Sequence, residues 1–262
     1  MAKRPPILAP TPAPRFRRVP PAVFPALLGL LGLVAAWYRA ADTLGVPTAL
    51  IDAAAGMVSL LFGFSVALYA VKVGLRPGVI VDDAQTLPGR TGAAALALGC
   101  IVLASLLVGR SAGLATMLTV VGVAMLRALA PWVMLRRLRG SDTAWPITPA
   151  MHLVFVGFVL IPTAAIPLNV LVPAMPWLML YCTLAALVIL AKTLPSLLRG
   201  DGAPPLRPLH VIHLAPPAFI ATGLFLTGFN QLGSYALIWA VIIAALLLFR
   251  LSWIVEGSFS PM

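Results

Sequence analysis

Several apolar runs, each roughly 20 residues long, constrain the fold of this chain more than any other feature. An α-helix needs about 20 apolar residues to cross the hydrocarbon core of a bilayer. Only 10% of the residues are charged, whereas soluble domains carry about 25%. The sequence therefore excludes a water-soluble globule and predicts an all-α, polytopic membrane protein whose first partner is the lipid bilayer.

Hydropathy predicts about eight transmembrane helices, at residues 22–40, 48–71, 91–109, 113–135, 149–168, 176–194, 208–228 and 232–255. The outer connections are short, so the helices pair into four hairpins, at 22–71, 91–135, 149–194 and 208–255, within one transmembrane domain (22–257). Odd-numbered helices start at intervals of about 60 residues, which indicates a repeated unit. Residues 1–21 form a basic, proline-rich tail that we expect to be retained.

The strong positive charge follows membrane topology. Fifteen of the 18 lysines and arginines fall on one side of the predicted membrane. The positive-inside rule makes that side the cytoplasm, so both termini are expected there. The arginines at the inner mouth have an alternative role, which is to concentrate anions: Arg15, Arg17, Arg18, Arg136, Arg137 and Arg139. Because topology explains the basicity, no nucleic-acid partner is predicted.

Prolines concentrate in the odd-numbered helices, at Pro25, Pro162, Pro167, Pro216 and Pro217. A proline frees a backbone carbonyl, which is tolerated in lipid only where protein or a water-filled cavity receives it. We therefore expect kinked odd helices to form an inner ring around a pore or transport site, with straighter even helices outside. Helix three lacks a proline and helix four contains Pro131, and the alternative is that the prolines only kink helices for packing.

Candidate pore-lining residues lie at or beside these breaks: Phe24, Pro25, Phe155, Phe158, Pro162, Pro216, Pro217 and Phe219. Aromatic side chains at such positions can narrow a pore. Their alternative role is packing or lipid contact.

Two titratable residues are further candidates. Arg127 lies about two turns inside helix four, where a charge is costly. It either faces the inner ring, extends toward the cytoplasmic headgroups or pairs with an inward polar group. His213 shares a helix face with His210, but His152 belongs to another hairpin and no Cys, Asp or Glu lies beside the pair. No metal site is predicted, and His213 is instead a candidate protonatable site near the cytoplasmic mouth.

Enzymatic activity is not expected. The sequence has no HExxH, no GxSxG, no paired acidic residues within a span and no phosphate-binding loop. Seven acidic residues in the whole chain leave little acid-base chemistry. No catalytic residue and no cofactor is predicted.

Three segments resemble the TehA-like tellurite-resistance and dicarboxylate transporter family, relatives of the slow-type anion channels. Pro205-Leu206-Arg207-Pro208 followed by Ile212-His213-Leu214-Ala215-Pro216-Pro217-Ala218 is similar to that family's seventh helix. Phe24-Pro25 with Ala36-Trp37-Tyr38-Arg39 resembles its first helix, and Ile147-Thr148-Pro149-Ala150 precedes the fifth. The resemblance runs the length of the chain.

This resemblance implies a bacterial inner-membrane anion channel or passive anion/C4-dicarboxylate transporter, associated with tellurite resistance and assembled as a homotrimer. Family members have five hairpins around one pore per subunit. Adding one repeat to helix seven places the next odd helix near 267, so residues 258–262 are expected to lead into a fifth hairpin that is missing, together with its aromatic gate. The chain is then either a truncated gene product or a non-conducting scaffold or regulatory remnant.

Overall fold

The computed structural model describes residues 19–140 and 145–256. Within these ranges the regular elements are all helical and no strand occurs, so the all-α expectation is confirmed. Most of the N-terminal tail (1–21) and the expected lead-in to a fifth hairpin (258–262) lie outside the described residues.

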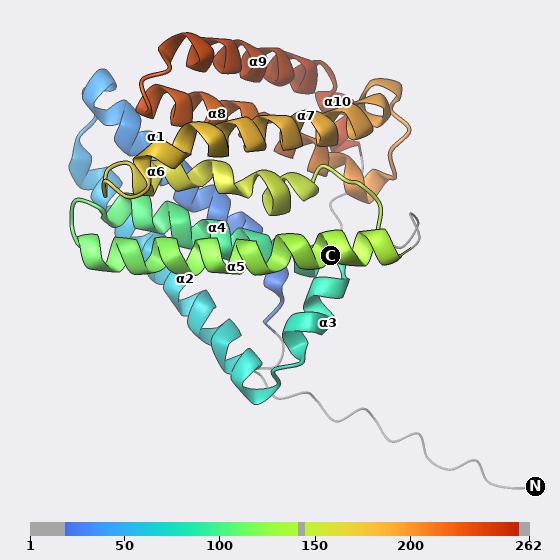
Figure 1. Cartoon of the computed structure of the whole chain (residues 1–262), viewed down its shortest axis with the longest axis horizontal. Coiled ribbons are helices and arrows are strands. Elements are labelled where there is room, and N and C mark those ends of the chain that lie inside the picture. Colours follow the sequence, from blue (N-terminus) through green and yellow to red (C-terminus); the bar gives the residue numbers. More distant parts are fainter. Residues whose placement is uncertain (1–18, 141–144, 257–262) are drawn as a thin grey trace, which may run out of the picture.

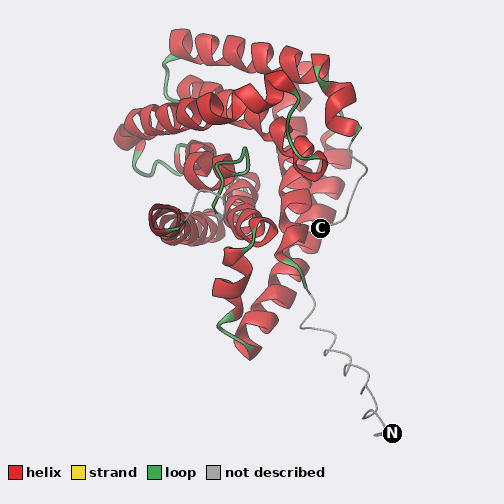
Figure 2. Ribbon diagram, turned by 90° about the vertical axis from the view of Figure 1, so that its right-hand side faces the viewer, coloured by secondary structure: helices red, strands yellow, loops and turns green. Residues whose placement is uncertain are grey.

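Seven helices in the described residues are long and apolar enough to cross a membrane, and the chain is a multi-pass membrane protein. Six are continuous: α1 (Phe24–Leu44), α2 (Thr48–Leu75), α4 (Leu87–Leu107), α5 (Ala112–Arg139), α7 (Met175–Arg199) and α9 (Asn230–Phe249). The other consists of a 3-10 segment (Pro204–Leu214) followed by α8 (Ala215–Leu226). Short helices α3 (Val79–Gln85), α6 (Ile161–Ala165) and α10 (Leu251–Val255) complete the order (Figures 1 and 2).

The fifth expected span, at 149–168, is not a long helix. It is a shorter apolar stretch, His152–Ala165, which we call the broken segment. The segment begins as a π-helical turn, tightens to a 3-10 turn over Gly157–Leu160 and ends as α6. Pro162 explains the tightening, because it offers no N–H to the carbonyl of Phe158, which accepts from the N–H of Ile161 instead.

Prolines also divide the seventh span. Pro216 and Pro217 have no N–H for the carbonyls of Ile212 and His213, four residues earlier. The N–H of Ala215 bonds to the carbonyl of Ile212, which continues the 3-10 pattern up to α8. The carbonyl of His213 receives no N–H from the residues three and four positions on, because both are prolines.

Prolines separate the odd-numbered from the even-numbered helices less cleanly than expected. α7 continues to Arg199 and contains Pro195, and α5 contains Pro131. Pro25 lies in the first turn of α1, where a missing N–H breaks no intrahelical bond. Proline position therefore does not by itself assign a helix to the inside.

α4 is the central helix of the molecule. Of its most apolar stretch, 72% is buried in protein, against 22% for α2 and for α5. It contacts α1, α2, α3, α5 and α6 (Figure 1). Small residues permit this close packing: a side chain at Gly99 would meet the ring of Phe62, and one at Gly122 of α5 would meet the backbone of Ala97.

α2 is inclined to the other long helices, and α3 leads back from its end toward α4 (Figure 1). A partly buried ion pair closes this corner, with Lys72 Nζ 2.9 Å from Asp83 Oδ2. Lys72 also donates to the carbonyl of Val19 at 3.1 Å, and the Tyr69 hydroxyl donates to Asp83 at 3.0 Å. At the opposite end of α2, Asp52 accepts hydrogen bonds from Tyr38 and Arg110.

Candidate functional site

A cavity of about 270 Å³ lies between α1, α4, the broken segment and the join between the 3-10 segment and α8. We call it the central cavity. These elements correspond to the first, third, fifth and seventh predicted spans. Its lining comprises Pro25, Leu28, Gly29, Gly32, Leu98, Val102, His152, Leu153, Val156, Gly157, Val159, Leu160, Ile212, Ala215, Pro216 and Phe219.

The central cavity contains no formal charge. Among its lining residues, His152 alone has a polar side chain, and none is Lys, Arg, Asp or Glu. Phe219 contributes the only phenyl ring. A site of this kind binds an anion weakly, so selection would depend on width and on the field of surrounding dipoles.

Three of the eight residues predicted to line a pore lie in this lining: Pro25, Pro216 and Phe219. Pro162 and Pro217 are buried in the surrounding protein and are not part of it.

The remaining three aromatic candidates pack elsewhere. Phe24 is fully buried, and its ring meets those of Phe62 and Tyr69 edge to face, with centroids 6.2 and 5.7 Å away. Phe158 lies 6.2 Å from the ring of Tyr181, and Phe155 packs against the core. All three rings therefore take the alternative role stated for them, which is packing against other side chains.

A buried chain of hydrogen bonds runs from the wall of the central cavity into α7. His152 Nε2 lies 2.8 Å from His213 Nδ1, and His213 Nε2 lies 3.0 Å from Thr193 Oγ1. Thr193 Oγ1 also lies 2.7 Å from the carbonyl oxygen of Ile189 in its own helix. We call His152, His213 and Thr193 the histidine chain.

The direction of each bond in the histidine chain follows from its last member. The Ile189 carbonyl only accepts, so the Thr193 hydroxyl donates to it and must accept from His213 Nε2–H. A neutral His213 then accepts at Nδ1 from His152 Nε2–H. His152 Nδ1 is left as an acceptor, and within the described residues it is buried without a hydrogen-bond partner.

His210 lies beside this chain but does not join it. Its ring centroid is 5.7 Å from that of His213 and 5.7 Å from that of Trp253, and its Nδ1 has no partner in the described structure. No group of three or more His, Cys, Asp or Glu side chains in the described residues is arranged to hold a metal ion. The sequence separated His152 from the other two histidines, whereas the fold gathers all three.

Arg127 lies near the middle of α5, and it is exposed on the surface of the helix. It does not line the central cavity. Within the described residues no carboxylate forms an ion pair with it. It is nine positions from Arg136, which corresponds to about 14 Å along a helix.

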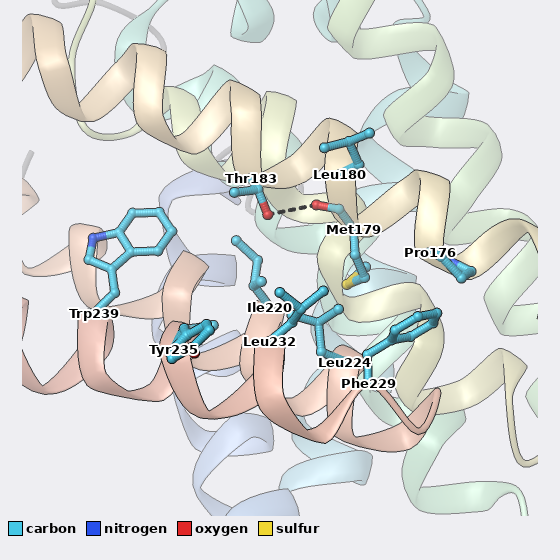
Figure 3. Close-up of a pocket in the computed structure, with 11 residues that line it drawn as sticks. Pro176, Met179, Leu180, Thr183, Ile220, Leu224, Phe229, Leu232, Tyr235 and Trp239 are labelled. Atoms are coloured by element: carbon cyan, nitrogen blue, oxygen red, sulfur yellow. Dashed lines mark hydrogen bonds between the residues drawn. The ribbon is translucent and has the colours of Figure 1, made fainter.

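A second cavity, of about 380 Å³, lies between α7, α8 and α9 (Figure 3). Its lining is apolar apart from Thr183 and the amphipathic rings of Tyr235 and Trp239. The Thr183 hydroxyl already donates to the carbonyl of Met179 at 2.8 Å, as Figure 3 shows. This cavity suits an apolar occupant, and its lining comes from the sixth, seventh and eighth predicted spans. The central cavity is lined by the odd-numbered spans alone, so we take it as the candidate site.

A scan against protein-family models finds no match for this chain, and a search of curated proteins finds no significant relative.

Proposed function

We propose that the protein is a bacterial inner-membrane anion channel or passive anion/C4-dicarboxylate transporter of the TehA-like family, associated with tellurite resistance. The ions pass between the odd-numbered spans, through the central cavity. Both termini lie in the cytoplasm, and three copies assemble, each with its own pathway. The protein is not an enzyme and needs no cofactor.

One observation supports this proposal above the others: the residues around the central cavity come from the first, third, fifth and seventh spans alone. These are the same four spans that would form the expected inner ring of odd-numbered helices. Pro216, where the seventh span changes from a 3-10 to an α-helical pattern, lies in the wall of this cavity, which supports an inner position for the broken helix.

The uncharged lining favours passage over tight binding. An ion that meets no opposite charge leaves as readily as it enters, which suits a passive pathway. Arginines at the cytoplasmic ends of the helices raise the local anion concentration and exclude cations. Small monovalent anions and C4 dicarboxylates are therefore the proposed substrates.

A flux assay tests this function. The full chain is reconstituted in liposomes, a membrane potential is imposed, and uptake of chloride, nitrate and malate is followed against protein-free liposomes. We expect uptake that follows the potential and needs no energy source. Absence of potential-driven passage for all three anions would refute the proposal.

The second candidate is a non-conducting scaffold or regulatory remnant. The observation that favours it is the apolar character of the central cavity, in which His152 is the only polar side chain. Under this hypothesis the flux assay shows no uptake, although the protein is folded and inserted.

A further inference from the structure

A polar pocket of about 370 Å³ lies at the C-terminal end of α5, away from the central cavity. We call it the arginine-tryptophan pocket. Its lining comprises Trp132, Leu135, Arg136, Arg139, Gly140 and Trp145. The two indole rings meet edge to face, with centroids 5.7 Å apart. The guanidinium of Arg136 lies 5.4 Å from the ring of Trp132, so a cation and an aromatic wall face the same space.

Both arginines of this pocket are exposed. In the described ranges neither Arg136 nor Arg139 pairs with a carboxylate. They are three positions apart in the last turn of α5, so they lie on one face of the helix. Two charges at one mouth, unpaired within the described part of the chain, leave the pocket complementary to an anion.

Stabilisation of the helix end does not account for this arrangement. Cations in the last turn offset the helix dipole wherever their side chains point. Arg137 also belongs to that turn, and it bonds to the carbonyl of Trp145. Arg136 and Arg139 instead border a pocket whose far wall, Trp145, is held by Arg90 of α4, with the guanidinium 4.2 Å from the ring. The pocket is therefore lined by the last turns of α5, by Gly140 and by Trp145, and Arg90 of α4 holds the Trp145 wall in place.

The position of the pocket identifies the source of the anion. Most basic residues of the chain lie on the membrane side where α5 ends, and tryptophans favour the headgroup level of a bilayer. Leu135 lines the pocket and is 49% exposed, and Leu138 beside it is 73% exposed, so an apolar surface adjoins the arginines. A free phosphate would use only the cations, whereas a phospholipid would also use this apolar flank.

We propose that the arginine-tryptophan pocket binds the headgroup of an anionic phospholipid from the leaflet that surrounds the end of α5. The phosphate lies between Arg136 and Arg139, and the acyl chains follow the exposed leucines. Zwitterionic lipids bind less well because their own cation competes for the phosphate. This site shares no lining residue with the central cavity, so lipid binding can be measured apart from anion transport.

Native mass spectrometry of the full chain tests the proposal. Delipidated protein in detergent is titrated with short-chain phosphatidylglycerol, phosphatidylcholine or inorganic phosphate. The double variant Arg136→Gln/Arg139→Gln is compared with Arg199→Gln/Arg250→Gln, which removes the same charge from other helix ends. Arg136→Lys/Arg139→Lys keeps both charges. It shows whether a loss of binding in the glutamine variant comes from the lost charge or from a folding defect.

We expect phosphatidylglycerol to bind at one saturable site, about tenfold more tightly than phosphatidylcholine, and the Arg136→Gln/Arg139→Gln variant to lose that difference. The lysine variant retains most of it, and the control variant retains all of it. Equal affinity for the two lipids, or an equal loss in the control variant, overturns the proposal. Inorganic phosphate that displaces phosphatidylglycerol also overturns it, since the site would then belong to a free anion.

Discussion

His152 Nε2 and His213 Nδ1 are 2.8 Å apart, although the two histidines are 61 positions apart in the sequence. His213 extends the contact to Thr193 of α7, so side-chain hydrogen bonds join three spans beside the central cavity. A buried polar network stabilises a fold only while each member keeps its partner. Substitutions in the histidine chain therefore have predictable costs.

Replacing His213 by phenylalanine is expected to destabilise the protein strongly. The change leaves His152 Nε2–H without an acceptor and Thr193 Oγ1 without a donor, at about 1–3 kcal/mol for each buried group. Thermal unfolding in detergent measures the loss. His210→Phe is the matched control, because His210 lies outside the chain, and equal losses for the two variants would contradict the assignment.

Thr193→Val tests whether the last hydrogen bond of the histidine chain stabilises the fold. Valine has nearly the shape of threonine but cannot accept from His213 Nε2–H, so we expect a loss of about 1–2 kcal/mol. Thr193→Ser keeps the hydroxyl and should lose less. A double-mutant cycle with His152→Phe is expected to give a coupling energy above about 0.5 kcal/mol, and strict additivity would count against a connected chain.

Phe219→Ala is expected to raise anion flux several-fold. Its side chain is the only phenyl ring in the central cavity, so its removal widens the space without adding charge. The measurement is the initial rate of nitrate uptake per protein in liposomes. Phe249→Ala, at a ring that is 81% exposed on α9, is the control and should leave the rate unchanged. Unchanged flux in Phe219→Ala would place the pathway elsewhere.

Arg127→Leu is expected to stabilise the membrane-embedded protein. An arginine near the middle of a span costs about 2.5–3.5 kcal/mol when it faces lipid, and leucine removes that cost. Thermal unfolding in nanodiscs is the measurement, with Arg199→Leu at the end of α7 as the control. A fall in stability would show that Arg127 has a partner, such as a neighbouring subunit.

Hydropathy predicted most of the fold because length and polarity alone decide whether a segment crosses lipid. Hydropathy overestimated the length of the helix at the broken segment. The apolar run is continuous there, but Pro162 and the π-helical turn shorten the regular helix. Proline content failed to identify α4 as the central helix. The relevant signal was its run of glycine and alanine, including Ala94, Ala97 and Gly99, because small side chains permit contact with many neighbours.

The candidate site was predicted in part. Pro25, Pro216 and Phe219 were assigned to the cavity because a proline break or its neighbour needs a polar or wet surrounding. The pairing of His152 with His213 left no local trace, since neither spacing nor composition links residues in different hairpins. The only feature of the sequence that could have suggested this pairing was a histidine in each of two apolar spans.

Thiol labelling of the central cavity tests the account most directly. Ala215→Cys lies in the cavity lining, and Ala245→Cys is its match on the exposed face of α9, in a background with Cys100→Ala and Cys182→Ala. A charged, membrane-impermeant methanethiosulfonate is added to liposomes while nitrate uptake is recorded. The account predicts that Ala215→Cys is modified and its flux blocked, while Ala245→Cys is unaffected. An unreactive Ala215→Cys with normal flux would contradict conduction through the central cavity.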